Sequence, residues 1–167
     1  PIDVQNQVVS KFRYPDDIKM RTYKPTVKGN IVQIHKVGKE LEKAKNPIIC
    51  ASGGVFLSDA QEELRAFAEK FQIPVVSTMM GIGVMPTEHP LYFGNVGNNG
   101  KPYANKAMNE SDFLIMVGAR VADRAVSQPD LITKNKVLVH IDIDPCEIGK
   151  NAGPTIPLVG DAKHIFE

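Results

Sequence analysis

The segment from Asp112 to Arg124, DFLIMVGARVADR, constrains the fold of this chain most strongly. Residues 113–118 form an apolar run that ends in glycine, which is typical of a strand buried on both faces of a parallel sheet. Ligands of such sheets bind where the carboxyl end of a strand meets the next turn, and guanidiniums there can neutralise phosphates. We therefore predict a ligand site in this turn, formed by Gly118, Ala119, Arg120, Asp123 and Arg124. The alternative is that Asp123 and Arg124 form a solvated surface pair.

Other short apolar runs predict further strands of the same sheet, at 47–52, 73–78, 136–144 and 156–160. Apolar residues at helical spacing predict helices at 31–44, 58–71 and 103–110. The second of these helices is expected to begin with a capping box of Ser58 and Gln61. Strand, helix and strand with short connections form the right-handed unit of a parallel sheet. The predicted fold class is α/β, a doubly wound and mostly parallel sheet, with a long, glycine-rich and functional loop at 79–100.

The domain organisation follows from where the periodic segments begin. Residues 1–29 are rich in proline and charged residues and show no sustained period, so we predict a linker there and one domain over 30–167. The chain begins at Pro1 without an initiator methionine and stops as residues 159–167 start to look helical. We therefore expect it to be a piece of a longer chain.

Charge and composition argue against several classes of partner. The formal net charge is +1 with both signs interspersed, which does not favour binding to nucleic acid or to an anionic membrane surface. No apolar stretch approaches the length of about 20 residues that spans a bilayer, and the first residues lack a signal-peptide pattern. The two cysteines, Cys50 and Cys146, match no disulfide framework. We expect a cytoplasmic protein with Cys50 as a small core residue.

Polar or glycine-rich turns follow all five predicted strands, and the carboxyl ends of parallel strands share one edge of a sheet. An extended dinucleotide would suit such an edge, although the chain has Ser52-Gly53-Gly54 in place of the usual GxGxxG. Asp142 and Asp144 could bind a ribose or could simply cap their own turn. No catalytic constellation is found: the histidines, His35, His89, His140 and His164, are expected to be structural or surface residues, and no metal-ligand spacing is present.

Six motifs in this order resemble one known family. They are SGG at 52–54, STMMGIG at 77–83, HPLYFGNVGNNG at 89–100, GARVADR at 118–124, VHIDIDPCEIGKN at 139–151 and VGDA at 159–162. Together they resemble the central, Rossmann-like domain of thiamine-diphosphate-dependent enzymes, and of acetolactate synthases in particular. The opening PIDVQ resembles the end of that family's N-terminal domain.

The resemblance implies an enzyme that decarboxylates pyruvate and joins the hydroxyethyl unit to a second 2-keto acid. Thiamine diphosphate and Mg²⁺ would be held by other domains, so this chain alone is expected to be inactive and to carry no catalytic residue. The family's central domain often carries FAD. The whole enzyme is expected to be a homo-oligomer, with a regulatory subunit as a further partner to consider.

Carried over by position, the FAD contacts form one set along the predicted edge. They are Ser52, Gly53, Gly54, Thr78, Met79, Gly118, Ala119, Arg120, Asp123, Arg124, Asp142, Ile143, Asp161 and Ala162. The chain departs from the family pattern where Asn95-Val96 and Asn98-Asn99 replace Met-Leu and Met-His, and at Ser52 and Ala122. Two alternatives therefore stay open. The domain could be a structural spacer or hold another nucleotide in a related decarboxylase, or it could be a free-standing nucleotide-binding module.

Overall fold

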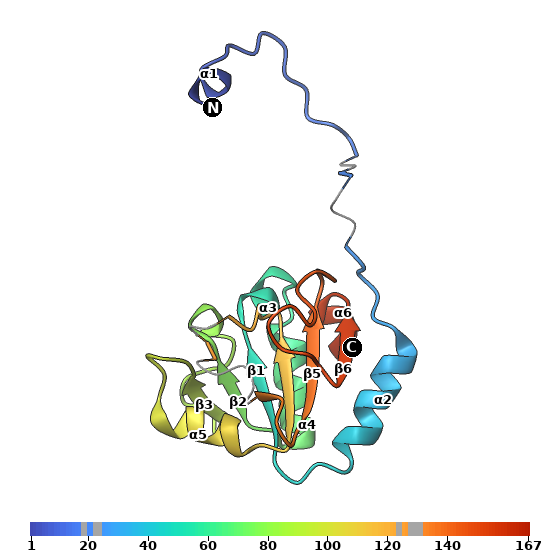
Figure 1. The fold of residues 1–167 in the computed structure, drawn as a ribbon, viewed down its shortest axis with the longest axis vertical. Coiled ribbons are helices and arrows are strands. Elements are labelled where there is room, and N and C mark those ends of the chain that lie inside the picture. The colour runs from blue at the N-terminus through green and yellow to red at the C-terminus, as the bar shows by residue number, and fades with distance from the viewer. Residues whose placement is uncertain (18–19, 22–24, 123–124, 127–131) are drawn as a thin grey trace.

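A computed structural model describes residues 1–17, 20–21, 25–122, 125–126 and 132–167 (Figure 1). Within them the chain forms one six-stranded sheet in which every neighbouring pair is parallel, with the order β3-β2-β1-β4-β5-β6. The strands are β1 (Pro47–Ala51), β2 (Val75–Ser77), β3 (Tyr92–Asn95), β4 (Phe113–Val117), β5 (Val137–Asp142) and β6 (Ile156–Val159). The predicted α/β class with a doubly wound parallel sheet is confirmed, and the order is that of a Rossmann fold.

The helices cover both faces of this sheet. They are α2 (Ile31–Leu41), α3 (Gly53–Leu57), α4 (Gln61–Phe71), α5 (Pro102–Glu110) and α6 (Ala162–Phe166), with a 3₁₀ turn η1 (Met79–Gly81). One core joins α2, α4 and α6 to strand residues such as Ile115 and Val139. The other joins α5 and the segment after β4 to the alternate residues, such as Met116 and Leu138. Both faces of β4 are therefore buried, as its continuous apolar run predicted.

The local sequence explains why α2 and α5 begin where they do. The side chain of Asn30 accepts hydrogen bonds from the backbone N–H groups of Val32 and Gln33, which caps the first turn of α2. Pro102 occupies the start of α5, where its missing N–H costs no helical hydrogen bond. Cys50 lies inside the core as predicted, and burial raises the pKa of its thiol to about 12.

The predicted capping box at Ser58 is wrong. Residues 53–57 form a helix of their own, α3, and Ser58 ends it by donating from its backbone N–H and its hydroxyl to the carbonyl of Gly54. Asp59 then adopts a left-handed conformation with φ 53°. The next helix, α4, begins at Gln61 after Ala60, which offers no side-chain cap.

The stretch 79–100, predicted as a loop, contains the strand β3, which is additional to the five predicted strands. In the described sheet this strand lies at the edge and pairs with β2. Its register shifts at a bulge, and its residues are only partly buried. A glycine inside the strand, Gly94, weakens the strand pattern in the sequence, and in the structure it has φ 88°.

The N-terminal segment lies apart from the sheet in Figure 1. Its described residues up to position 17 are all exposed, and residues 2–5 form one short helix, α1 (Ile2–Gln5), which was not predicted. The chain joins the folded part where the carbonyl of Val27 accepts the N–H of Asp161 at 2.8 Å. Among the described residues no helix is long and apolar enough to cross a membrane.

Candidate functional site

The carboxyl ends of β1 and β4 lie next to each other at the point where the strand order reverses. From β1 the chain crosses to β2 and β3 on one side, whereas β4, β5 and β6 continue on the other side. Ligands of open α/β sheets bind in the crevice at this switch point. The two turns that meet there are the predicted segments 52–54 and 118–120.

The backbones of these two turns touch. The N–H of Ser52 donates to Val117 and that of Gly54 donates to Gly118, at 3.0 and 3.1 Å. A Cβ added to Gly54 would lie 2.5 Å from the Cα of Gly118, which real Cβ atoms essentially never show. Gly118 also has φ 56°, a conformation that glycine adopts without strain. Both glycines are therefore required by packing, whether or not a ligand binds.

A pair of buried hydroxyls joins the ends of β1 and β2. The side-chain oxygens of Ser52 and Thr78 lie 2.6 Å apart, and these residues are 8% and 6% exposed. Gly81 packs against the same turn, where an added Cβ would lie 2.3 Å from the carbonyl oxygen of Ala51. The first glycine that the family pattern would place at position 52 is thus replaced by a serine whose hydroxyl has a partner.

The turn after β4 alternates between buried and exposed residues. Ala119 and Val121 are 3% and 2% exposed, whereas Arg120 is exposed, and its guanidinium has no partner among the described residues. The N–H of Gly118 donates to the carbonyl of Ile141 at 2.8 Å, which ties this turn to β5. Asp123 and Arg124, which were also predicted to contact a ligand, lie outside the described residues.

The predicted acids after β5 and β6 are used by their own turns. Asp142 accepts the N–H of Asp144 at 3.0 Å, and Asp144 accepts that of Cys146 at 2.9 Å. Asp161 caps α6 by accepting the N–H of Lys163 at 3.0 Å. Each acid satisfies a local backbone donor, as the turn-cap interpretation expected for Asp142 and Asp144. In each case Oδ1 is the acceptor, and Oδ2 has no hydrogen bond within the described part of the chain.

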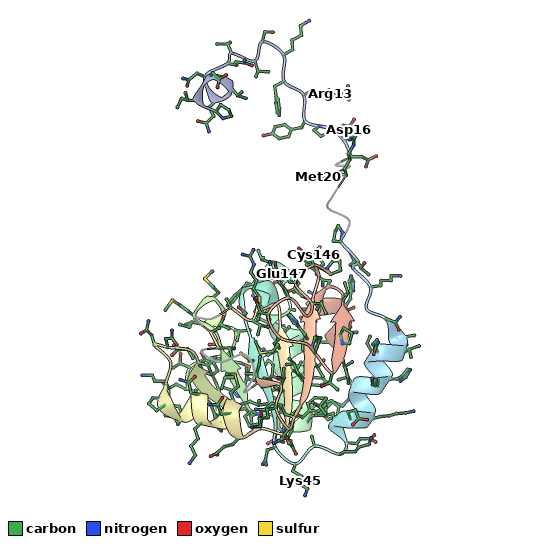
Figure 2. All side chains as sticks on the ribbon, viewed as in Figure 1. Arg13, Asp16, Met20, Lys45, Cys146 and Glu147 are labelled. Atoms are coloured by element: carbon green, nitrogen blue, oxygen red, sulfur yellow. The ribbon has the colours of Figure 1, made fainter. Side chains whose placement is uncertain are left out.

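The remaining predicted residues lie along the same edge with different exposure. Met79 is 63% exposed on η1, Ile143 is partly buried, and Ala162 is 6% exposed at the start of α6. Hydrogen bonds link the edge from strand to strand, since Thr78 bonds to Ser52, Gly54 to Gly118, and the N–H of Gly160 to the carbonyl of Asp142. Figure 2 shows Cys146 and Glu147, which follow β5, at the opposite end of the sheet from Lys45, which precedes β1.

The glycine-rich segment 94–100 is held by α5. Asn105 accepts the N–H of Gly97 at 2.9 Å and donates to its carbonyl at 3.0 Å. Gly97 has φ 104°, and an added Cβ on Gly100 would lie 2.5 Å from the carbonyl carbon of Val96. The glycines that match the family pattern are thus needed by the loop itself.

Two residues of the edge were not predicted from the sequence. Nε2 of His140 lies 2.8 Å from the carbonyl oxygen of Ala119, and Nδ2 of Asn151 donates to the carbonyl of Arg120 at 2.9 Å. The sequence indicated only that His140 alternates with apolar strand residues. The contacts themselves join residues 21 and 31 positions apart, which no local pattern reveals.

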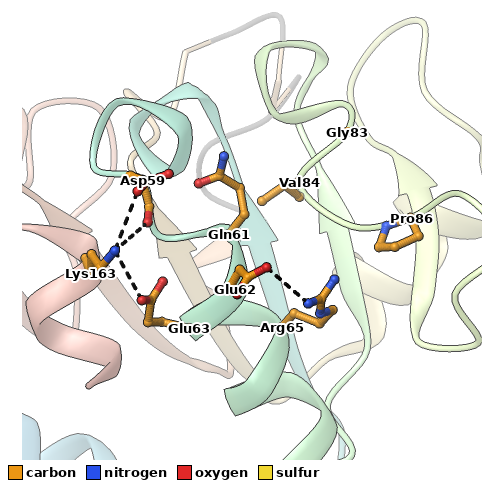
Figure 3. A pocket seen from close by; sticks show the side chains of 9 residues that line it. All are labelled: Asp59, Gln61, Glu62, Glu63, Arg65, Gly83, Val84, Pro86 and Lys163. Atoms are coloured by element: carbon orange, nitrogen blue, oxygen red, sulfur yellow. Dashed lines mark hydrogen bonds and ion pairs between the residues drawn. The ribbon is translucent and has the colours of Figure 1, made fainter.

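A hollow of about 510 Å³ lies away from this edge, between the start of α4 and the segment after η1 (Figure 3). Its charged residues are paired with one another: Lys163 contacts Glu63 and Asp59, and Arg65 lies 3.6 Å from Glu62. None of the predicted site residues lines it. In the described part of the chain no group of three or more histidine, cysteine or acidic side chains could hold a metal ion.

Comparisons with known proteins agree with the motifs. Residues 34–167 match the family described as "Thiamine pyrophosphate enzyme, central domain". The chain is 39% identical over 171 residues to the acetolactate synthase large subunit of Buchnera aphidicola from Acyrthosiphon pisum, covering 99% of this chain and 30% of that protein. It is 42% identical to a probable acetolactate synthase large subunit of Methanocaldococcus jannaschii, covering 99% of this chain and 28% of the relative. It is 41% identical to the acetolactate synthase large subunit of Corynebacterium glutamicum, covering 99% of this chain and 26% of that protein. The chain thus spans less than a third of the length of these relatives.

Proposed function

This chain belongs to the thiamine pyrophosphate enzyme family as its central domain, and we propose that it is the middle part of an acetolactate synthase large subunit. Such an enzyme would decarboxylate pyruvate and join the two-carbon unit to a second 2-keto acid. Support comes from relatives that carry this name and match nearly the whole chain. The cytoplasmic location and a homo-oligomeric assembly with a regulatory subunit remain predictions.

In this proposal the chemistry takes place outside the present chain. Thiamine diphosphate supplies a carbanion-stabilising centre when bound, and it would be held with Mg²⁺ by other parts of the protein. The described residues here offer neither a metal cluster nor a nucleophile oriented by a base. The role left for this domain is to bind a cofactor that does not react, or to serve as a spacer.

We propose that the edge at the β1–β4 switch point binds FAD. The single observation that carries this proposal is the contact between segments 52–54 and 118–120 at the position where α/β sheets bind nucleotides. The residues fit the group chemically: the Arg120 guanidinium suits a phosphate, and the exposed Met79 offers an apolar contact to a flavin ring. Asp142 and Asp161 each keep one carboxylate oxygen for a ribose or water.

The test is the flavin content of the full-length protein. Purified protein should show flavin absorption bands, or acquire them when reconstituted with FAD. Protein that stays colourless and resists reconstitution would instead favour the structural spacer. The hydrogen bonds that Asp142, Asp144 and Asp161 accept from their own turns are consistent with that alternative.

Arg120→Ala should weaken FAD binding by about 10- to 150-fold, as expected for losing a charge-assisted contact worth about 1.5–3 kcal/mol. A matched control is Arg65→Ala, because Arg65 lies in the hollow beside Glu62 and touches none of the predicted residues. Equal FAD dissociation constants for the two variants would reject a phosphate role for Arg120.

A further inference from the structure

The turn after β4 holds one of its residues, Val121, in an unfavourable backbone conformation. Val121 has φ 52°, although its branched side chain disfavours the left-handed region. Such a conformation persists where the surrounding structure holds it. The groups that hold this turn therefore decide where Arg120 stands.

We infer that His140 and Asn151 are positioning residues, which hold the carbonyl oxygens of Ala119 and Arg120 and so fix the backbone from which the Arg120 side chain extends. The importance of this role for a cofactor rests on the proposed FAD site. The positioning itself rests only on the contacts of the turn.

His140 makes its contact from inside the core. It is 1% exposed and follows Leu138 by two residues, so both lie on the face of β5 that packs against the segment after β4. A carbonyl oxygen can only accept a hydrogen bond, so Nε2 must carry the hydrogen that it donates to Ala119. Nδ1 is then unprotonated in the neutral ring and has no partner among the described residues.

The environment favours the neutral ring. Burial lowers the pKa of His140, while the hydrogen bond to Ala119 and the charges of Asp142 and Glu147 oppose that shift without cancelling it. A neutral imidazole with hydrogen on Nε2 is a fixed donor, and it gives the turn one defined position.

Asn151 holds the next carbonyl of the turn, that of Arg120. Its Nδ2 donates to Arg120 at 2.9 Å from the loop that follows β5. Together with the N–H of Gly118, which donates to Ile141, three consecutive residues are tied to β5 and its loop. Arg120 is thus anchored by its backbone, although its guanidinium has no partner in the described part of the chain.

The experiment compares His140→Leu with His140→Gln in the full-length protein. Glutamine can place an N–H close to the position of Nε2, whereas leucine fills the space without a donor. Hydrogen exchange of the peptide that covers 118–122 reports the turn, and the FAD dissociation constant reports its use. We expect His140→Leu to speed exchange and to weaken FAD binding about tenfold, and His140→Gln to restore both.

Val139→Ala is the matched control, because Val139 is adjacent on the strand but faces the other core. It should lower stability without changing FAD affinity or exchange at 118–122. If His140→Leu does not fold, Asn151→Asp removes the second donor from an exposed residue and should speed exchange in the same peptide.

The outcomes separate the two ideas. Wild-type exchange at 118–122 in both His140→Leu and Asn151→Asp overturns the positioning role. If exchange at 118–122 is as fast in His140→Gln as in His140→Leu, the positioning role of His140 is overturned. Fast exchange in His140→Leu and Asn151→Asp, rescued by His140→Gln, in a protein that never binds FAD keeps the positioning role and rejects the proposed cofactor.

Discussion

At the carboxyl edge of the sheet, the turns after β1 and β4 press backbone against backbone, whereas the turns after β5 and β6 are held by their own aspartates. In the first pair, Gly54 and Gly118 leave no space for a Cβ, and the Arg120 side chain has no partner among the described residues. In the second pair, Asp144 and Asp161 satisfy backbone N–H groups. The glycine pair therefore resists change for steric reasons, and the acids contribute individual hydrogen bonds.

The largest effect is expected at the glycine pair. In Gly118→Ala the new methyl group would clash with Gly54 and would hold alanine at φ 56°. We expect a loss of about 3 kcal/mol in the free energy of unfolding, measured by urea denaturation.

The matched control for that substitution is Gly38→Ala. Gly38 lies in α2 with nothing within 4 Å of an added Cβ, so alanine there should stabilise the protein by about 0.5–1 kcal/mol. Similar stability of the two variants would show that the turns after β1 and β4 can move apart. It would contradict the claim that Gly54 and Gly118 resist change for steric reasons.

A smaller loss is expected at the cap of α6. Asp161→Ala should lower the free energy of unfolding by about 1 kcal/mol because two backbone N–H groups lose their acceptor. Asn30→Ala, which removes the equivalent cap of α2, should cost a similar amount. An Asp161→Ala variant with unchanged stability but weaker FAD binding would show that this acid serves the ligand and not the turn.

Lowering the pH should reduce the free energy of unfolding through the buried His140, which contacts the turn after β4. Because burial lowers the pKa of His140 in the folded state, the unfolded chain binds more protons near and below its ordinary pKa of about 6.5. The stability due to neutral His140 is thus complete above that pH and is lost as the pH falls below it. In urea titrations at several pH values, His140→Gln should lack this component, and an identical pH dependence in both proteins would contradict the assignment.

The smallest effect is expected at Asp144. Asp144→Asn keeps an oxygen that can accept the N–H of Cys146, so its free energy of unfolding should change by less than about 0.5 kcal/mol. Thermal melting measures the change in stability. Asp144→Ala, which removes the acceptor altogether, serves as the control. A large loss in the asparagine variant would mean that the charge, and not the turn geometry, matters here.

The sequence by itself determined the layers of this fold. Uninterrupted apolar runs such as residues 113–117 indicate burial on both faces. The helices between successive strands act as crossovers and so favour parallel neighbours. The same patterns placed the predicted turns on one edge, and the motifs identified the family that residues 34–167 match. Boundaries were less certain, because Ser58 ends α3 and does not open α4.

Only the tertiary structure decided how that edge is built. The strand β3 depends on pairing with β2 at a bulge, so its own residues carry little signal. The contact between Gly54 and Gly118 joins two turns that are distant in the sequence, and so do the hydrogen bonds from His140 and Asn151 to the turn after β4. Periodicity records which side of an element is buried, whereas the partner that a buried group meets depends on how separate elements pack. For that reason the sequence could name Arg120, but only the fold shows what holds it in place.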